Sequence, residues 1–382
     1  MIAKPHRDVS LDYLRATLTL MVVAHHSCLA YTTFARRTSG DYLTWSAPVV
    51  DPAAHSLFFD YAENFNDVFF MSLMFLISGL FIAPALRRSA PAGFVGQRLL
   101  RLGLPFLVGM IVLTPLAYWG AWRAAGHEEG LLTYWRLNVT QHGWPTGPLW
   151  FIWLLLAFDI IAAALYPFLP AAPAIGGGEQ PARAFALLLA ASGLAYLPLL
   201  AAFGFGRWTA LLTPPFYFQV SRILLYFVWF SAGAVIGARD LEKGFLARDG
   251  KLARHWLWWV IACFVAYNLL VFAPRILPLT PHGRGDLEAA LWVLSCTASS
   301  FAFLALFRGV VRQRRAWMDS LARSAYAIYL VHYVFVLWTQ YALLAAPLSA
   351  AAKFLATFAI ATSMSWITAQ ALLRIPGAQR VI

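Results

Sequence analysis

The first apolar stretch of the chain, residues 11–32, contains one acidic, one basic and two imidazole side chains: Asp12, Arg15, His25 and His26. In a helix, residues 15 and 26 are separated by about 20° beyond three full turns, so both side chains lie on one face, about 16 Å apart along the axis. His25 points about 100° away from that face. Asp12 precedes Arg15 by three residues and can pair with it. The pattern predicts a helix with a fixed cation near one end and an imidazole near the other.

These residue types favour proton-transfer chemistry. An imidazole titrates near neutral pH, so His26 can accept the proton of an attacking hydroxyl and return it to a leaving group. His26 could also act as a nucleophile and form a covalent intermediate. A structural interpretation stays open as well, in which Arg15 reaches the lipid headgroups and His26 bonds a neighbouring helix.

A general base usually needs an orienting partner. Two candidate carboxylates lie at the outer end of the second apolar stretch, one lies within the fourth and one at the start of the eighth, and each could equally belong to an ordinary ion pair. They are Glu63, Asp67, Asp159 and Glu288.

Further candidates occur late in the chain and in the middle. Tyr329 and His332 are three residues apart on one helix face, and they could line a channel or form a structural interhelical bond. Trp150 could stack on a sugar, although tryptophans are also common at membrane interfaces. The remaining histidines show no metal-ligand spacing, so no metal site is predicted. We expect Cys28, Cys263 and Cys296 to be buried thiols without disulfides.

Long apolar helices must position these residues. The chain has 382 residues, of which 61% are hydrophobic and 12% are charged, and this composition excludes a large water-soluble catalytic domain. It predicts an all-α, polytopic membrane bundle of about ten helices. The expected crossings are 11–32, 67–86, 102–122, 148–169, 184–203, 215–237, 255–273, 287–307, 324–344 and 350–373.

The distribution of charge predicts the orientation. Most Lys and Arg residues fall in the connections on the side of the N-terminus, including Arg98 and Arg101, so both termini are expected in the cytoplasm. The net charge of +12 is then a topology signal, and no basic stripe indicates nucleic-acid binding. We expect a single domain over 1–382, with a cytoplasmic linker at 170–183, where Pro and Gly cluster.

Several motifs occur in one order along the chain. They are Arg15-x10-His26; Phe69-Phe70-Met71 followed by Phe75-Leu76-Ile77-Ser78-Gly79; Arg98-Leu99-Leu100-Arg101; Leu149-Trp150-Phe151; and Ser324 to His332. In this order they resemble the membrane acyltransferase-3 family. The long first loop and the run at 104–110 look most like the branch that contains the periplasmic-glucan succinyltransferases.

The resemblance implies an integral membrane O-acyltransferase in a bacterial-type inner membrane. It would move an acyl group from cytoplasmic acyl-CoA, either acetyl-CoA or succinyl-CoA, to a hydroxyl of an extracytoplasmic glycan, with no tightly bound cofactor. His26 would be the catalytic base, and Arg15, Arg98 and Arg101 would bind acyl-CoA, whose phosphates need cations. The pantetheine arm would pass Arg15 and present its thioester near His26.

Two other classes of protein remain possible from the residues alone. In a transporter or glycan exporter, Arg15 and His26 would belong to a substrate or proton path. In a structural membrane protein, Arg15 would affect only stability. The sequence leaves open the identity of the acyl group and of the acceptor glycan, the carboxylate that supports His26, and the oligomeric state. It also leaves open whether transfer is direct or passes through an acyl-histidine intermediate.

Overall fold

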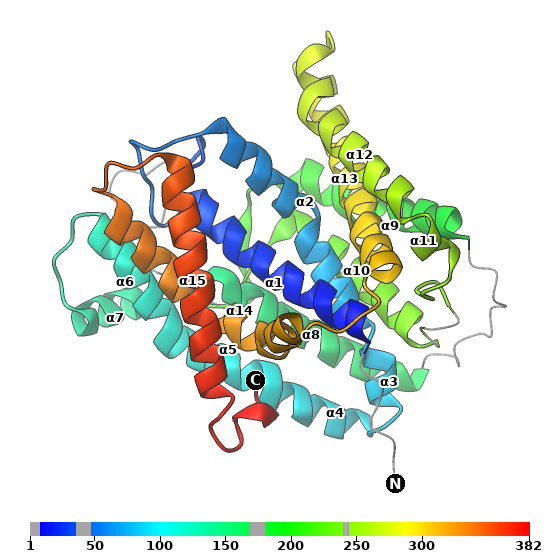
Figure 1. Cartoon of the computed structure of the whole chain (residues 1–382), viewed down its shortest axis with the longest axis horizontal. Helices are drawn as coiled ribbons and strands as arrows, with labels where there is room; N and C mark the ends of the chain where they lie inside the picture. Colours follow the sequence, from blue (N-terminus) through cyan, green and yellow to red (C-terminus); the bar gives the residue numbers. More distant parts are fainter. Residues whose placement is uncertain (1–7, 36–46, 142, 169–179, 240, 242–243) are drawn as a thin grey trace.

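The computed structural model describes residues 8–35, 47–141, 143–168, 180–239, 241 and 244–382, and it is built almost entirely of helices (Figure 1). The helices are α1 (Val9–Leu29), α2 (Leu57–Gly79), α3 (Ile82–Leu86), α4 (Pro91–Arg98), α5 (Leu104–Val108), α6 (Thr114–Ala124), α7 (Leu131–Thr140), α8 (Trp150–Leu165), α9 (Pro181–Phe203), α10 (Ile223–Gly237), α11 (Lys251–Arg254), α12 (Trp256–Ile276), α13 (Pro281–Val310), α14 (Ala316–Leu343) and α15 (Ala350–Leu372). Two π-helical turns, η1 (Leu99–Gly103) and η2 (Gly109–Leu113), join α4, α5 and α6, and one hairpin pairs β1 (Trp208–Ala210) with β2 (Tyr217–Gln219).

Within the described ranges, nine helical stretches are long and apolar enough to cross a membrane. They are Leu57–Leu86, Pro91–Ala124, Gly147–Phe168, Pro181–Phe203, Val220–Gly237, Trp256–Ile276, Pro281–Val310, Ala316–Leu343 and Ala350–Leu372. The predicted all-α polytopic membrane bundle is therefore confirmed. The first predicted crossing corresponds to α1, which is not among the nine because its polar residues lower its hydropathy.

Several spans begin earlier than predicted, and the second crossing shows the reason most clearly. The second crossing was expected from residue 67, but α2 begins at Leu57 and includes Asp60, Glu63 and Asp67 within the helix. Apolarity alone misses these turns because they carry carboxylates, although Ser56 caps the helix start. Most of the predicted linker at 170–183 lies outside the described residues, and its last three residues belong to α9.

Helix α1 runs through the middle of the bundle, packed against α2, α14 and α15 (Figure 1). One row of its side chains, Leu11, Leu14, Leu18 and Val22, is buried in the cluster that also contains the apolar residues of α2. A second row, which includes Tyr13 and Ala16, packs with residues of α14. Spacings of three and four residues produce each row. Because other helices cover these two rows, several polar side chains of α1 are buried, among them Thr19, His25 and Ser27.

Helices α2 and α10 approach each other closely at small residues. A Cβ atom on Gly79 would lie 2.1 Å from the carbonyl oxygen of Phe230, and one on Gly233 would lie 2.0 Å from that of Leu76. Only glycine permits such contact, which is a common device for packing membrane helices. The close contact between α2 and α10 thus explains why the Ser78-Gly79 motif ends in a glycine.

Prolines reshape the third span, Pro91–Ala124, in two places. Pro105 has no N–H with which to bond the carbonyl of Arg101, and the hydroxyl of Tyr326 on α14 donates to that carbonyl at 2.7 Å. The π-helical turn η1 lies directly before this proline. A neighbouring helix therefore supplies the hydrogen bond that this carbonyl lacks within its own helix, as the membrane interior requires.

The second distortion, η2, precedes Pro115, which likewise frees carbonyls of the preceding turn. The indole of Trp135 donates to the carbonyl of Ile111 at 2.8 Å, and the indole of Trp144 donates to that of Met110 at 3.1 Å. These bonds fasten α7 and the following loop to the third span. That loop forms part of the site described next.

Candidate active site

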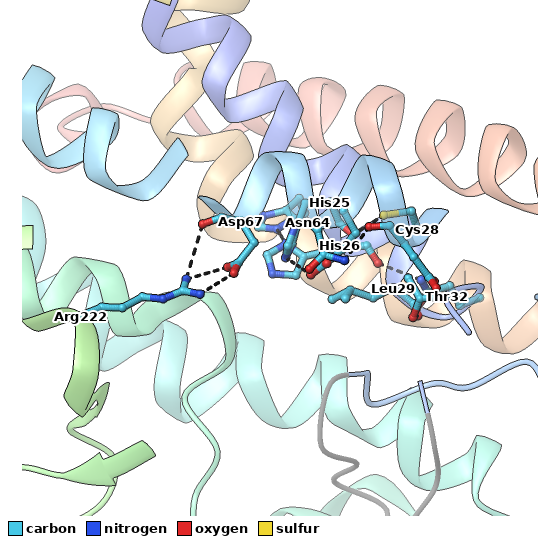
Figure 2. Close-up of polar contacts among 12 residues, drawn as sticks. His25, His26, Cys28, Leu29, Thr32, Asn64, Asp67 and Arg222 are labelled. Carbon is cyan, nitrogen blue, oxygen red and sulfur yellow. Dashed lines mark hydrogen bonds and ion pairs between the residues drawn. The ribbon is translucent and has the colours of Figure 1, made fainter. Parts of the chain in front are cut away.

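A cavity of about 490 Å³ lies between α1, α2, α10, α14, the loop before α8 and the β1–β2 hairpin. Its lining includes His25, His26, Asp67, Trp150 and Tyr329, all of which were named from the sequence. Figure 2 shows His25 and His26 on α1 beside Asp67 on α2, with Arg222 reaching Asp67 from the start of α10. The volume falls in the range of ordinary small-molecule sites, about 300–1,000 Å³.

His26 forms a hydrogen bond with His332 of α14. The Nδ1 atom of His26 lies 3.1 Å from Nε2 of His332, and Nδ1 of His332 lies 2.6 Å from the carbonyl oxygen of Tyr329. The carbonyl can only accept, so Nδ1 of a neutral His332 carries the proton and its Nε2 is an acceptor. Nδ1–H of His26 then donates to His332. This leaves a lone pair on Nε2 of His26, which is the state that a general base needs.

Further contacts hold this pair of imidazoles in place. The Tyr329 hydroxyl donates to the carbonyl of Pro148, in the loop before α8. Gln340 of α14 donates to the carbonyls of His26 at 2.9 Å and Ser27 at 3.2 Å, so it fixes α1 against α14 at the level of the site. The ring of Tyr333 packs against His26 with a centroid separation of 4.9 Å. Both the position and the tautomer of His26 are thus set by α14.

His25 also lines the cavity but has different partners. Its Nε2 lies 3.6 Å from a carboxylate oxygen of Glu63, which is buried on α2. Glu63 was a candidate to orient His26; the structure places it beside His25 instead. The reason is geometric, because the two histidines point in different directions from α1 and their rings are edge-to-face.

Asp67 was a second candidate to orient His26, and it is engaged elsewhere. Arg222 donates to the two carboxylate oxygens of Asp67 at 2.8 and 2.5 Å. The guanidinium also lies over the rings of Phe205 and Trp292, at 4.6 and 4.9 Å from the centroids. Arg222 is 2% exposed, so this bidentate pair is a fixed feature of the cavity wall.

The two remaining carboxylate candidates are also accounted for. Asp159 of α8 is 1% exposed and pairs with Arg98, with Nε of the arginine 3.1 Å from the carboxylate. Glu288 is exposed near the start of α13. Within the described residues, the partner that orients His26 is therefore a histidine rather than a carboxylate.

The predicted donor-binding arginines lie away from this cavity. Arg15 pairs with Asp12 at 3.3 Å, as expected, and its side chain is 37% exposed. Arg98 turns toward Asp159 of α8, whereas Arg101 is exposed. Arg98 and Arg101 are three residues apart and would share one face of a regular α-helix, but the π-helical turn η1 starts between them and changes their angular relation. None of these arginines belongs to the described lining of the cavity.

Trp150 stacks on Tyr226 at 5.5 Å and meets Trp208 edge-on at 5.7 Å. The cysteines are buried free thiols. Across the described parts of the chain, no group of three or more His, Cys, Asp or Glu side chains is arranged to hold a metal ion.

Sequence reasoning missed the roles of several residues at this site. Gln340 sits in an apolar stretch and its polarity was a usable signal, whereas Tyr118 and Tyr333 resemble ordinary membrane aromatics. Arg222 lies 155 residues after Asp67 in the chain. Its partner on α2 could not be inferred from spacing.

A comparison with known protein families identifies the family of this chain. The family model described as an acyltransferase domain, the acyltransferase-3 model, matches residues 8–370. The chain belongs to this family, and together with its apolar helices this makes it a multi-pass membrane acyltransferase. A comparison with curated proteins gave no match.

Proposed function

We propose that this protein transfers an acyl group from cytoplasmic acyl-CoA to a hydroxyl of a glycan on the far side of the inner membrane. The observation that carries the proposal is the His26–His332 pair in the cavity, because it leaves Nε2 of His26 able to accept a proton. Family membership supports the acyl transfer. The resemblance to the periplasmic-glucan branch makes a glucan the first acceptor to test.

The reaction needs one base and no external reagent. Nε2 of His26 takes the proton from the glycan hydroxyl as its oxygen attacks the thioester carbon. The new O–C bond forms, the C–S bond breaks, and the CoA thiolate takes the proton back from His26. His332 accepts from Nδ1–H throughout, so it stabilises the imidazolium that exists between the two transfers. The direct route is the one we propose, since both substrates can meet in one cavity.

The donor would enter from the opposite end of α1. Arg15 lies about 16 Å along the helix from His26. The flexible pantetheine arm of CoA would span this distance, and the phosphates of CoA would stay at the far end of it. Arg101 is exposed within the first π-helical turn and would contact those phosphates. Arg98, already paired with Asp159, would help mainly by holding α4 against α8.

The orientation of the chain is part of the proposal. Both termini would lie in the cytoplasm, because the basic residues concentrate in connections on the side where α1 begins. His26, near the other end of α1, would then open toward the outer side. Reporter fusions to either terminus, active only in the cytoplasm, would test this arrangement.

The deciding experiment uses purified protein with radiolabelled acetyl-CoA or succinyl-CoA and a soluble glucan. Wild-type protein should release CoA and label the glucan, whereas His26→Ala should do neither while eluting and melting like the wild type. His282→Ala is the matched control, since His282 is exposed on α13. Glycan flux across vesicles without CoA release would instead identify a transporter and refute the proposal.

A further inference from the structure

The β1–β2 hairpin presents one of its faces to the cavity. Trp208 of β1 stands opposite Gln219 of β2, and Ala210 stands opposite Tyr217. Side chains alternate between the two faces of a strand, so Trp208, Gln219 and Tyr217 share a face. These three residues line the cavity, and Thr209 and Phe218 of the alternate face do not. The register of this short sheet therefore directs an indole and an amide into the site.

The hairpin is held rigidly in this position. Trp153 of α8 donates to the carbonyl of Tyr217 at 2.9 Å, and the Tyr217 hydroxyl donates to the carbonyl of Gly143 at 2.8 Å. Thr146, in the loop before α8, donates to the carbonyl of Pro215. The amide nitrogen of Gln219 donates to the carbonyl of Phe205 at 2.5 Å. A pre-organised surface of this kind lowers the cost of ordering a ligand.

Trp208 is 46% exposed although it lines the cavity, so part of its ring is available for contact. Its edge-on neighbour Trp150, stacked on Tyr226, supplies a second aromatic surface beside it. Flat aromatic faces suit ligands with an apolar face and a polar rim. A pyranose ring has this shape, with C–H groups on its faces and hydroxyls around its edge.

Hydrogen-bonding groups for such a rim surround the aromatic surfaces. Asp67 accepts two bonds from Arg222 and still has lone pairs, and its side chain is 26% exposed. Gln219 uses its amide nitrogen on Phe205 and keeps its carbonyl oxygen as an acceptor. Among the described lining residues, the only fully charged side chains are Asp67 and Arg222, which neutralise each other. The lining thus matches an uncharged sugar better than an anionic ligand.

We infer that the hairpin face forms the acceptor subsite, in which Trp208 stacks on a neutral pyranose ring while Asp67 and Gln219 bind its hydroxyls. The inference rests on the proposed function for the chemistry that follows, since the sugar held here would present a hydroxyl to His26 in the same cavity. The binding itself requires no turnover. It can therefore be tested separately from acyl transfer.

The test measures binding in a His26→Ala background, where no transfer occurs. Saturation-transfer NMR would titrate sophorose, a β-linked glucose disaccharide, and in parallel CoA. Trp208→Ala should weaken sophorose binding about tenfold, as expected for the loss of one stacked aromatic contact, and should leave CoA binding unchanged. Trp208→Phe should recover most of the affinity, because it retains an aromatic face. Trp258→Ala is the matched control, since Trp258 is 69% exposed and lies outside the cavity lining.

Each outcome decides the inference. Loss of sophorose affinity in Trp208→Ala alone, with thermal stability unchanged, supports the subsite even if acyl transfer is later refuted. Equal loss in Trp258→Ala, weakened CoA binding in Trp208→Ala, or no binding of sophorose and longer glucans to the parent protein would overturn it. In the active enzyme, the same substitution should raise the KM for the glucan about tenfold without changing the KM for acyl-CoA.

Discussion

The role of His332 provides the sharpest test of the site. In His332→Phe, an aromatic ring of similar size replaces the imidazole, but the acceptor for Nδ1–H of His26 is lost. His26 can then adopt either neutral tautomer, and its imidazolium form has no partner on α14. In His332→Gln, the side-chain oxygen can restore an acceptor for His26.

The expected magnitude follows from the bond that is removed. The His26–His332 hydrogen bond is 3.1 Å long, and His332 is fully buried. When His26 carries a proton, this bond is charge-assisted and is worth about 1.5–3 kcal/mol. The loss corresponds to a fall in kcat of about 10- to 100-fold. Replacing the carboxylate that orients the histidine of a catalytic triad lowers kcat by about 10⁴-fold. We expect a smaller fall for His332, because a neutral imidazole is a weaker acceptor than a carboxylate.

The assay is CoA release in the presence of glucan, followed as a function of pH. His332→Phe should lower kcat with little change in either KM, because the substitution acts through His26 rather than on substrate binding. His332→Gln should recover part of the rate. His255→Gln is the matched control, since His255 also bonds a carbonyl of the preceding turn but is exposed and outside the site.

The reasoning would be wrong if His332→Phe retained full kcat. It would also be wrong if the loss appeared only in KM, or if His332→Phe and His332→Gln lost activity only in proportion to a loss of folded protein. In any of these cases, His332 would be a packing residue and the tautomer argument would have no consequence for catalysis.

Three further predictions concern the framework and the donor end. Lys353 and Asp51 form a buried pair at 2.6 Å, so Lys353→Met should reduce stability by about 3–5 kcal/mol and shift thermal unfolding downward, whereas combining it with Asp51→Leu should recover most of the loss. Burial raises the pKa of Asp8, but the attraction of Arg308 and hydrogen bonds from the start of α1 lower it to about 2. Since this pKa is below the unfolded value, Asp8 should contribute about 2 kcal/mol at neutral pH that is lost as pH falls from about 4 to 2, and acid unfolding of Asp8→Asn should lack that component. Arg101→Ala should raise the KM for acyl-CoA about tenfold without changing thermal stability, and an unchanged KM would remove Arg101 from the donor site.

The framework predictions matter for the site because both ion pairs anchor the helix that carries His26 or the loop that follows it. Lys353 of α15 binds Asp51, three residues after Pro48, which lines the cavity. Asp8 caps the start of α1 and bonds Arg308 of α13. Each pair connects the central helix, or the loop that follows it, to a helix from the second half of the chain.

Much of the architecture was accessible from the sequence. Apolar stretches and helical periodicity are local properties, so they predicted the polytopic bundle and the approximate places of its helices. The ordered motifs from Arg15 to His332 were enough to identify the family. The boundaries of α2 and the π-helical turns of the third span were missed, because carboxylates interrupt the apolar pattern in one case and prolines alter the turn in the other.

The sequence by itself determined that His26 stands in an apolar helix, some three turns from a cation, and that it could act as a base. Only the tertiary structure decided which side chain controls it. His26 and His332 are 306 residues apart, as Arg222 and Asp67 are 155 apart, and the packing of whole helices brings each pair together. The rotation of one helix against another depends on all the residues between them, including the glycines where α2 meets α10. For this reason a histidine, rather than one of the expected carboxylates, came to lie beside His26.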